Sequence, residues 1–521
     1  MKETGYQETD CKKTGWKEQN WVWMILLCTV LVICVGILLT LCADEGIDYD
    51  EAYSYQAARD YTQLGIVQKM IDDYDTDVPL YYNALRIWIS LFGGIGHRFF
   101  AARLFSVAGA VASMLLGITV VRRNWGGWTA LFFMIATTLA PAMLHVSVNI
   151  RMYSWTNFLV TAAALLVYGI LQAPERKSRW ILLGLCTAAG LFSHYFTAFA
   201  FALLYLFLLV ALLRRGSKSW RSVFVCGGLP VAALVGWMVV SGFFHFVKTD
   251  SGEVEIKKLT VKGLLYYLFQ TDMQYDLAIG VTLVATAFVG AAVCLCLFAG
   301  RRKAQGSDGH TMRNSVNTED VQADRLLGCY AMMCIAVVFI SYFAGLLLSS
   351  FASHFFIARH IMHATGIMWL GVAIVLPRIS WQTYAAGLLV LLCMCHANYD
   401  RQYESAYRDT PYLEDTKVFI ATQMEPGDIV IYSSPKQYYR LYLCYMPEQE
   451  FLWLKELTDD QIQALAGRRV WYFSTNWKEY FTDEQVERFA IRSENVGHYG
   501  FQIMNNCTDF DLLRLTIGGA Q

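Results

Sequence analysis

Long apolar blocks are the feature of this chain that most limits how it can fold. Of its 521 residues, 56% are hydrophobic and 16% are charged, whereas a soluble chain carries more charge. A run of about twenty apolar residues is long enough to cross a bilayer as a helix. The blocks therefore predict a polytopic α-helical membrane protein with eleven spans, near residues 21–43, 101–121, 127–147, 153–172, 180–193, 196–213, 222–243, 277–299, 326–348, 361–377 and 381–396.

The short blocks 180–193 and 196–213 run together through His194 and Tyr195, so they form either two spans or one long buried helix. The first block, 21–43, follows a polar stretch of 20 residues and is longer than the apolar core of a cleaved signal peptide. We therefore interpret it as an uncleaved signal anchor.

Basic residues in alternate loops predict the orientation. With eleven spans, the basic clusters share one side, which the positive-inside rule identifies as cytoplasmic: Lys12, Lys13, Lys17, Arg122, Arg123, Arg176, Lys177, Arg179, Arg214, Arg215, Lys218, Arg301, Arg302, Lys303 and Arg378. The protein is thus expected in the cell membrane with a cytoplasmic tail at 1–20. The large first loop, 44–99, and everything after residue 398 lie outside. A net charge of −1 gives no sign of nucleic-acid binding.

The composition changes at about residue 399. A turn at 425–428 precedes the strand-like segment 429–432, and further strands are expected at 469–473 and 501–504. Thr458 and Thr482 each begin a capping box that opens a helix. These signals predict a transmembrane domain at 21–398 followed by a small extracytoplasmic α/β domain at 399–521.

Most of the 14 cysteines lie in apolar blocks, where they serve as small hydrophobic residues. Cys444 and Cys507 fall in the C-terminal domain, on the side of the membrane where disulfides form. They form either a disulfide or two free thiols.

An acidic cluster follows the first predicted span. Residues 48–55 read Asp-Tyr-Asp-Glu-Ala-Tyr-Ser-Tyr and place Asp48, Asp50 and Glu51 beside the membrane. Carboxylates in such a position are costly unless they are solvated, paired or used. They either solvate the loop or supply the base that deprotonates a water-soluble acceptor beside a lipid-borne donor.

Two loop segments are apolar but too short to span. They are 85–91 in the first outer loop and 264–269 in the loop 244–276. We expect both to lie in the membrane interface. They indicate either a site that lipid head groups reach or ordinary loop packing.

Several separated motifs occur in one order: Asp50-Glu51-Ala52-Tyr53, Val78-Pro79-Leu80-Tyr81-Tyr82, Arg103-Leu104-Phe105-Ser106, Arg151-Met152-Tyr153-Ser154, His194-Tyr195-Phe196, and then Arg359. Together, over about 21–380, they resemble the C-type (GT-C) membrane glycosyltransferases of the protein O-mannosyltransferase and lipid A aminoarabinose transferase group, family 39-like. The resemblance implies an inverting hexosyl- or pentosyltransferase. Such an enzyme moves a sugar from a polyprenyl-phosphate carrier to an acceptor on the outer face of the membrane.

The resemblance also implies roles for single residues. Asp50 matches the general base, and Glu51 matches a neighbour that orients the site or binds the acceptor. Arg359 matches the arginine that binds the carrier phosphate, for which a planar guanidinium is well suited. A departing phosphate needs charge neutralisation more than protonation, so the scheme requires no cofactor or metal. Further candidates are Arg151 and His194 at the donor phosphate, and Asp77, Tyr81 and Asn149 at the acceptor or sugar.

The chain departs from the family pattern in two loops. Many bacterial relatives have Glu-Ala-Arg-Met-Tyr where this chain has Asn149-Ile150-Arg151-Met152-Tyr153. Many also have His-Pro-Pro-Leu-Tyr where this chain has Asp77-Val78-Pro79-Leu80-Tyr81. An acid has thus moved between loops, with Asp77 compensating for Asn149. These changes leave open the sugar and the acceptor, which is a protein, a glycolipid or a cell-wall polymer.

Plainer explanations exist for the basic candidates. Arg151 either snorkels to the interface or binds an anionic partner, and His194 is either an ordinary interfacial histidine or part of the donor site. Arg359 lies outside, against the positive-inside trend, which favours a phosphate contact over a topological anchor.

Two other protein classes compete with the transferase: a transporter or flippase of lipid-linked sugars, and a membrane scaffold. Transporters usually bind at mid-bilayer between broken helices. The acids here cluster in outer loops, which favours chemistry at the membrane surface.

Overall fold

The structure is a computed structural model that describes residues 20–72, 77–243, 318–352, 358–408, 410–434, 438–475, 481–501 and 509–518. Four predictions therefore lie wholly or mainly outside the described residues. They are the span 277–299, the interfacial segment 264–269, the strand 501–504 and the pairing of Cys444 with Cys507.

Long helices form most of the molecule, as the apolar blocks predict. Within the described residues, seven helices are long and apolar enough to cross a membrane, or eight if a bent pair is one span. The polytopic α-helical class is therefore confirmed, while the count of eleven spans stays a prediction. The helices at the predicted blocks are α1 (Asn20–Cys42), α5 (Phe100–Leu116), α7 (Gly127–Leu139), α8 (Pro141–Val148), α9 (Tyr153–Gln172), α10 (Lys177–Ser193), α11 (Thr197–Arg214), α12 (Arg221–Val240), α16 (Thr318–Ala352), α17 (Thr365–Ile379) and α18 (Trp381–Arg408).

Two of these predicted spans are shaped by a break in the chain. Blocks 180–193 and 196–213 form separate helices because His194, at the end of α10, takes an extended backbone (φ −163°, ψ 115°). The single long helix is therefore wrong. Block 127–147 bends by 60° between α7 and α8, where Pro141 lacks the N–H that would continue the helix. Asn398 Nδ2 donates to the Pro141 carbonyl at 3.2 Å and so satisfies one group at the bend.

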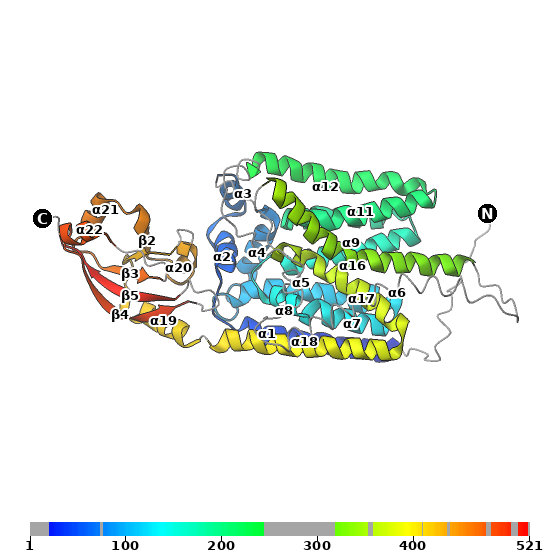
Figure 1. Ribbon diagram of the computed structural model, residues 1–521, viewed down its shortest axis with the longest axis horizontal. Helices are drawn as coiled ribbons and strands as arrows, with labels where there is room; N and C mark the ends of the chain where they lie inside the picture. Colours follow the sequence, from blue (N-terminus) through cyan, green and yellow to red (C-terminus); the bar gives the residue numbers. More distant parts are fainter. Residues whose placement is uncertain are drawn as a thin grey trace.

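The first outer loop folds over one end of the helical bundle. It contains α2 (Tyr49–Asp60), α3 (Gln63–Asp72) and α4 (Pro79–Phe92), which lie between the bundle and the C-terminal sheet in Figure 1. In α4, Leu85 is buried whereas Ile87 and Leu91 are exposed. The helix therefore presents apolar side chains outward, and its position in the membrane interface stays a prediction.

The C-terminal part contains a five-stranded sheet in the order β2-β1-β3-β5-β4. β1 (Ile429–Tyr432) pairs in parallel with β2 (Glu450–Trp453) and β3 (Val470–Ser474), whereas β5 (Asp509–Thr516) is antiparallel to β3 and β4 (Arg492–Gly500). Strands β1 and β3 match the predicted segments; β2, β4 and β5 were not predicted. The sheet is accompanied by α19 (Thr410–Gln423), α20 (Tyr439–Tyr445), α21 (Asp459–Ala464) and α22 (Asp483–Arg488).

Both predicted capping boxes are present. The Thr458 side chain accepts a hydrogen bond from the Gln461 N–H, and Thr482 does the same for Gln485. Each glutamine side chain bonds back to the N–H of its threonine. These reciprocal bonds satisfy N–H groups that the first turn of a helix leaves open.

Helix α18 passes through the predicted domain boundary. It continues to Arg408, although its sequence turns polar near residue 400, because glutamine, glutamate, alanine and arginine support a helix in water. The change of composition at 399 therefore falls inside one helix, and the boundary between 398 and 399 stays a prediction.

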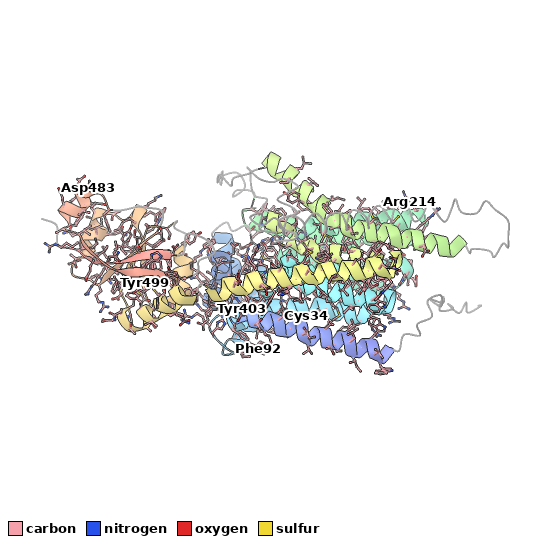
Figure 2. All side chains as sticks on the ribbon, turned by 60° about the horizontal axis from the view of Figure 1, so that its bottom comes forward. Cys34, Phe92, Arg214, Tyr403, Asp483 and Tyr499 are labelled. Atoms are coloured by element: carbon pink, nitrogen blue, oxygen red, sulfur yellow. The ribbon has the colours of Figure 1, made fainter. Side chains whose placement is uncertain are left out.

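The sheet-containing part packs against the first outer loop. Tyr445 Oη donates to the Glu45 carbonyl at 3.0 Å, Arg98 donates to the Cys444 carbonyl, and Lys417 Nζ lies 2.5 Å from Glu45 Oε2. In Figure 2, Arg214 lies at the end of the bundle away from Asp483 and Tyr499. The first outer loop and the sheet thus share one end of the molecule, and the basic end of α11 lies at the other.

Candidate active site

The site begins at the first turn of α2. Asp48 is the N-cap residue, and its carboxylate accepts a hydrogen bond from the Glu51 N–H at 2.7 Å. Glu51 Oε2 in turn accepts from the Asp48 N–H at 3.2 Å. The spacing Asp-x-x-Glu is a capping-box signal. The sequence therefore contains a signal for the N-cap role of Asp48, although that role was not predicted.

Glu51 joins α2 to two other segments of the chain. Its Oε1 accepts from the Ile150 N–H at 2.8 Å, and its Oε2 lies 3.5 Å from Arg103 Nη2 in α5. The Glu51 side chain is 4% exposed and that of Arg103 is 5% exposed. A buried charge without a partner would cost several kcal/mol, so these contacts make Glu51 a structural clamp.

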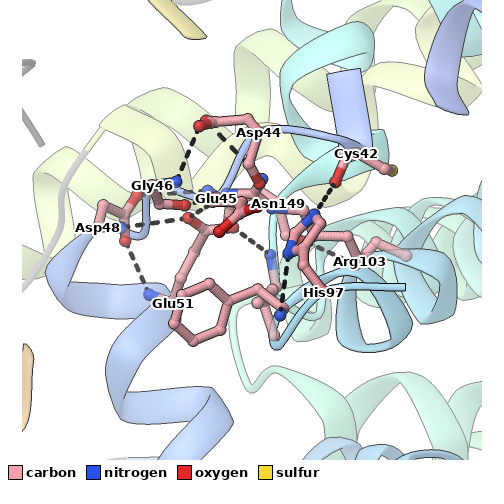
Figure 3. A network of polar contacts seen from close by, with 12 residues as sticks. Cys42, Asp44, Glu45, Gly46, Asp48, Glu51, His97, Arg103 and Asn149 are labelled. Atoms are coloured by element: carbon pink, nitrogen blue, oxygen red, sulfur yellow. Dashed lines mark hydrogen bonds and ion pairs between the residues drawn. The ribbon is translucent and has the colours of Figure 1, made fainter. Parts of the chain in front are cut away.

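Arg103 fixes the chain between α1 and α2. It donates to the carbonyls of Asp44 and Gly46, and its Nη1 lies 3.7 Å from the Asp44 carboxylate. Figure 3 shows this network, in which Glu51 contacts both Asp48 and Arg103. The sequence motif that contains Arg103 was identified, but the role of Arg103 was not predicted. No local sequence pattern indicates that α5 packs against this loop.

The segment between α8 and α9 closes the network from the other side. Asn149 Nδ2 donates to Asp48 Oδ2 at 3.3 Å, and the Asn149 carbonyl accepts from Ser106 Oγ at 2.5 Å. Arg151 Nη1 lies 3.2 Å from Ser54 Oγ and 3.5 Å from the Asp50 carbonyl. The Arg151 guanidinium thus faces groups of the protein.

Asp77, Tyr81 and Tyr82 join the same network from the start of α4. Tyr82 Oη donates to Asp77 Oδ2 at 2.5 Å and lies 3.4 Å from Arg151 Nη1. Burial lowers the pKa of Arg151, but Tyr82, Asp50 and Asp77 together raise it well above its ordinary value. Tyr81 is buried against Phe105, with ring centroids 5.7 Å apart, and burial raises its pKa. The segments that contain Asp77 and Asn149 therefore meet near Arg151.

Asp50 occupies a different position from its neighbours. It lies in the first turn of α2 and is partly exposed, whereas Glu51 is buried. The N-terminal end of a helix stabilises a nearby negative charge. A partly exposed acid in the first turn of a helix is suited to meet a substrate.

The Asp48 carboxyl is the acid with the clearest shift in this cluster. Burial, followed by the nearby charges of Glu51 and Asp50, raises its pKa to about 6, while the hydrogen bond from the Glu51 N–H opposes the rise. Its two oxygens accept from Glu51 and Asn149. Asp48 therefore serves as the cap that places Asp50, one residue into the helix.

A second group surrounds His194. Its ring centroid lies 5.3 Å from that of His360, 6.2 Å from that of His363 and 5.5 Å from that of Tyr153. Tyr153 begins α9 two residues after Arg151, so this cluster lies beside the first network. The 3-10 helix η4 (Ala358–Ala364) carries Arg359 directly before His360, and the Arg359 side chain is outside the described part of the structure.

The end of η4 is attached to α9. Asn157 Nδ2 donates to the Met362 carbonyl at 2.5 Å, and Asn157 Oδ1 accepts from the Gly366 N–H at 2.8 Å. A Cβ atom at Gly366 would lie 2.8 Å from Thr161 Oγ1, so the close approach of α17 to α9 favours glycine. This contact brings Arg359 to the end of the bundle that holds Asp50.

The candidate residues thus form two groups. Glu51, Asn149, Arg151, Asp77 and Tyr81 lie in or against one hydrogen-bonded network with Asp50 at its edge, and His194 lies with η4. Over the described ranges of the chain, no three His, Cys, Asp or Glu side chains are grouped closely enough to hold a metal ion.

The sequence matches no family model and no curated protein. Solved structures do match. ArnT from Cupriavidus metallidurans in the apo state is 12% identical with a TM-score of 0.44, over 96% of this chain and 99% of that chain. ArnT bound to undecaprenyl phosphate is 11% identical with a TM-score of 0.43, over 97% of this chain and 100% of that chain.

The archaeal oligosaccharyltransferase AglB from Archaeoglobus fulgidus, in complex with an inhibitory peptide and a dolichol-phosphate, also matches. It is 11% identical with a TM-score of 0.44, and the match covers 82% of this chain and 64% of AglB. ArnT is an aminoarabinose transferase, so the group that the motifs resemble is among the matched structures. At this identity and TM-score the likeness is distant, and the case for a function rests on the polar site.

Proposed function

We propose that this protein is an inverting GT-C-type glycosyltransferase that moves a sugar from a polyprenyl-phosphate carrier to an acceptor on the outer face of the membrane. The observation that carries the proposal is the position of Asp50. It is a partly exposed carboxylate at the edge of a buried network, at the end of a bundle of membrane-spanning helices.

In this reaction Asp50 is the general base. The acceptor hydroxyl gives its proton to the Asp50 carboxylate as its oxygen attacks the anomeric carbon. The bond from that carbon to the phosphate oxygen breaks with its electron pair, and polyprenyl phosphate leaves from the opposite face. Glu51 is suited to hold Asp50 in place, because both of its own oxygens are engaged by Ile150, Arg103 and Asp48.

We assign the donor phosphate to the second group. Arg359 is proposed as the main contact, since a guanidinium binds phosphate oxygens in pairs and keeps its charge. His194 lies beside His360, the residue after Arg359, and is proposed to line the same site. Neutralising the phosphate by arginine leaves no step that needs a metal or cofactor.

Asp77, Tyr81 and Asn149 are proposed on the acceptor or sugar side. Asp77 accepts a hydrogen bond from Tyr82, which lies 3.4 Å from Arg151, and Asn149 donates to Asp48. Arg151 is therefore a positioning residue in addition to a candidate for the phosphate. The sugar is a hexose or pentose, and the acceptor is a protein, a glycolipid or a cell-wall polymer.

One observation favours a transporter of lipid-linked sugars, namely the broken pair α7 and α8, since transporters bind substrates at broken helices. Two neutral polar groups near this break are, however, engaged within the protein. Asn398 bonds the Pro141 carbonyl, and Thr365 Oγ1 lies 2.7 Å from the Met143 sulfur. The charged residues lie at the end of the bundle, which favours the transferase.

We further propose that the sheet-containing part lies outside the cell and that the chain begins in the cytoplasm. The placement of basic residues supports this orientation. A protease added to intact protoplasts should then cut after residue 408. Protection of this part would contradict the orientation.

The function is tested with purified protein in nanodiscs. Polyprenyl-phosphate sugars labelled in a hexose or a pentose are supplied with envelope material that retains its proteins, glycolipids and cell-wall polymers. The parent protein should move label into the acceptor fraction and release polyprenyl phosphate, and Asp50→Asn should not. If no donor yields label in any fraction and undecaprenyl phosphate does not bind, the proposed function is wrong.

A further inference from the structure

The C-terminal part brings one cation to the face of α2 beside Asp50. We propose that Arg440 binds an anionic group of the acceptor, so that the acceptor is a hydroxyl compound bearing a phosphate or a carboxylate. This inference rests on the proposed function and deepens it, because it assigns a chemical class to the acceptor and a role in substrate binding to the sheet-containing part.

Arg440 lies at the start of α20, over the ring of Tyr53 and beside the hydroxyl of Tyr49, both in α2. Its guanidinium carbon is 4.8 Å from the centroid of the Tyr53 ring, and its Nη1 is 3.5 Å from Tyr49 Oη. Tyr439 also lies beneath it, at 6.0 Å. A guanidinium on aromatic rings keeps its charge and its outward N–H donors.

Arg440 differs in its contacts from three other basic residues of the C-terminal part, each of which is paired with a carboxylate. Lys417 is paired with Glu45, Arg469 with Glu425 and Asp428, and Arg488 with Asp459. Among the residues that the structure describes, no carboxylate lies within ion-pair distance of Arg440. A partly exposed arginine whose protein contacts are tyrosines has the capacity to take a bidentate anion.

Arg440 lies close to Asp50, the proposed base. Tyr49 and Tyr53 lie one residue before and three residues after Asp50, and one turn of helix rises about 5.4 Å. Arg440 therefore lies within about one helical turn of the proposed base, measured along α2. Tyr49 and Tyr438, partly exposed and with ring centroids 5.5 Å apart, add an aromatic surface on which the C–H face of a sugar ring packs.

Contacts other than those of Arg440 also hold α20 in place. The attachment of α20 is supplied by the bond from Arg98 to the Cys444 carbonyl, by Tyr445 to the Glu45 carbonyl, and by the Cys444 thiol 3.8 Å from the Ala52 carbonyl. Removal of the Arg440 charge therefore changes the surface above α2 and leaves these contacts intact.

The test compares Arg440→Gln, Arg440→Lys and the parent protein in the labelled transfer assay. We expect Arg440→Gln to raise the KM for the acceptor fraction about tenfold, the usual worth of one charge-assisted contact, with kcat and undecaprenyl phosphate binding unchanged. Arg440→Lys should recover part of the loss. Inorganic phosphate should compete with the acceptor in the parent and much less in Arg440→Gln.

Phosphatase treatment and carboxyl amidation of the acceptor fraction separate the two anions, because the treatment that removes the relevant group should raise the parent KM and leave Arg440→Gln unaffected. Lys417→Ala is the matched control, since it breaks a contact between the same parts of the chain away from the tyrosines.

If Arg440→Gln binds undecaprenyl phosphate more weakly, Arg440 contacts the donor and the inference is wrong. It is also wrong if parent and variant share one acceptor KM while transfer proceeds, a result that leaves the proposed function standing. If Arg440→Gln unfolds, the KM of Arg440→Lys decides: a parental value overturns bidentate binding.

Discussion

The two groups of the candidate site are held in different ways. Around α2, peptide groups and charged side chains from the first loop, α5 and the segment before α9 bond one another, with Glu51 at the centre. Around His194, the described contacts are mainly between rings: Tyr153, Tyr195, Phe196, His360 and His363. The first group is held by hydrogen bonds and ion pairs between side chains, whereas in the second group ring contacts stand beside the hydrogen bonds from Asn157 to the backbone around η4.

The difference fits two tasks. A base must stand within hydrogen-bonding distance of the proton it takes, and directional bonds give that accuracy. A binding surface for a carrier must admit a bulky lipid-linked group and release it after transfer, and ring contacts tolerate small shifts better than bonded charges. Variants in each group should therefore fail in different ways.

The largest effect is expected at Asp50. Asp50→Asn keeps the size of the side chain and cannot accept a proton, so transfer should fall by about 10²- to 10⁴-fold. Binding of undecaprenyl phosphate, measured in nanodiscs, should stay within twofold of the parent. The control is Asp72→Asn, at the exposed end of α3. Near-parental turnover in Asp50→Asn would show that Asp50 is not the general base.

Glu51 should fail through stability. Glu51→Ala removes one of the two carboxylates beside the buried Arg103 and leaves the Ile150 N–H without its acceptor, a loss on the order of 3–5 kcal/mol. The thermal unfolding temperature in detergent should drop sharply, whereas Glu45→Ala, which breaks an exposed pair with Lys417, should change it little. A stable but inactive Glu51→Gln, beside an active Asp50→Asn, would exchange the roles of the two residues.

Arg359 tests the second group. Arg359→Ala should weaken undecaprenyl phosphate binding and slow transfer together, by about ten- to a hundredfold, because the phosphate gains charge as the glycosidic bond breaks. Arg359→Lys should recover part of both. Arg378→Ala, in the last turn of α17, is the control. Parental binding and turnover in Arg359→Ala would make Arg359 an anchor and transfer the phosphate contact to Arg151 or His194.

The smallest effect concerns Asp48 and pH. A carboxyl whose pKa is about 6 in the folded protein, above its ordinary value, favours folding below pH 4 and loses that contribution as the pH rises to 6. Asp48→Asn keeps the helix cap and does not titrate. The stability of the variant relative to the parent should therefore increase between pH 4 and pH 7, by less than about 3 kcal/mol because the side chain is partly exposed. An unchanged difference across this range would show that Asp48 does not titrate there.

The sequence predicted the parts of the molecule that depend on local pattern. Apolar length located the helices, and the spacing of threonine and glutamine located α21 and α22. It did not predict β4, whose residues are mostly polar and exposed, nor β5, although β5 alternates between exposed polar and buried apolar residues over much of its length. The meeting of Arg103, Glu51 and Ile150 also escaped it, because that contact depends on how α2, α5 and α9 pack and one of its donors is a backbone N–H.

That backbone donor has a consequence for how this site tolerates change over evolutionary time. Glu51 grips the amide of Ile150, a group that nineteen of the twenty amino acids supply. Other apolar residues that fit the buried site can therefore replace Ile150. Proline alone removes the hydrogen bond to Glu51, because it has no backbone N–H. Proteins that keep this hydrogen bond share the backbone geometry at position 150, while the amino acid at that position varies.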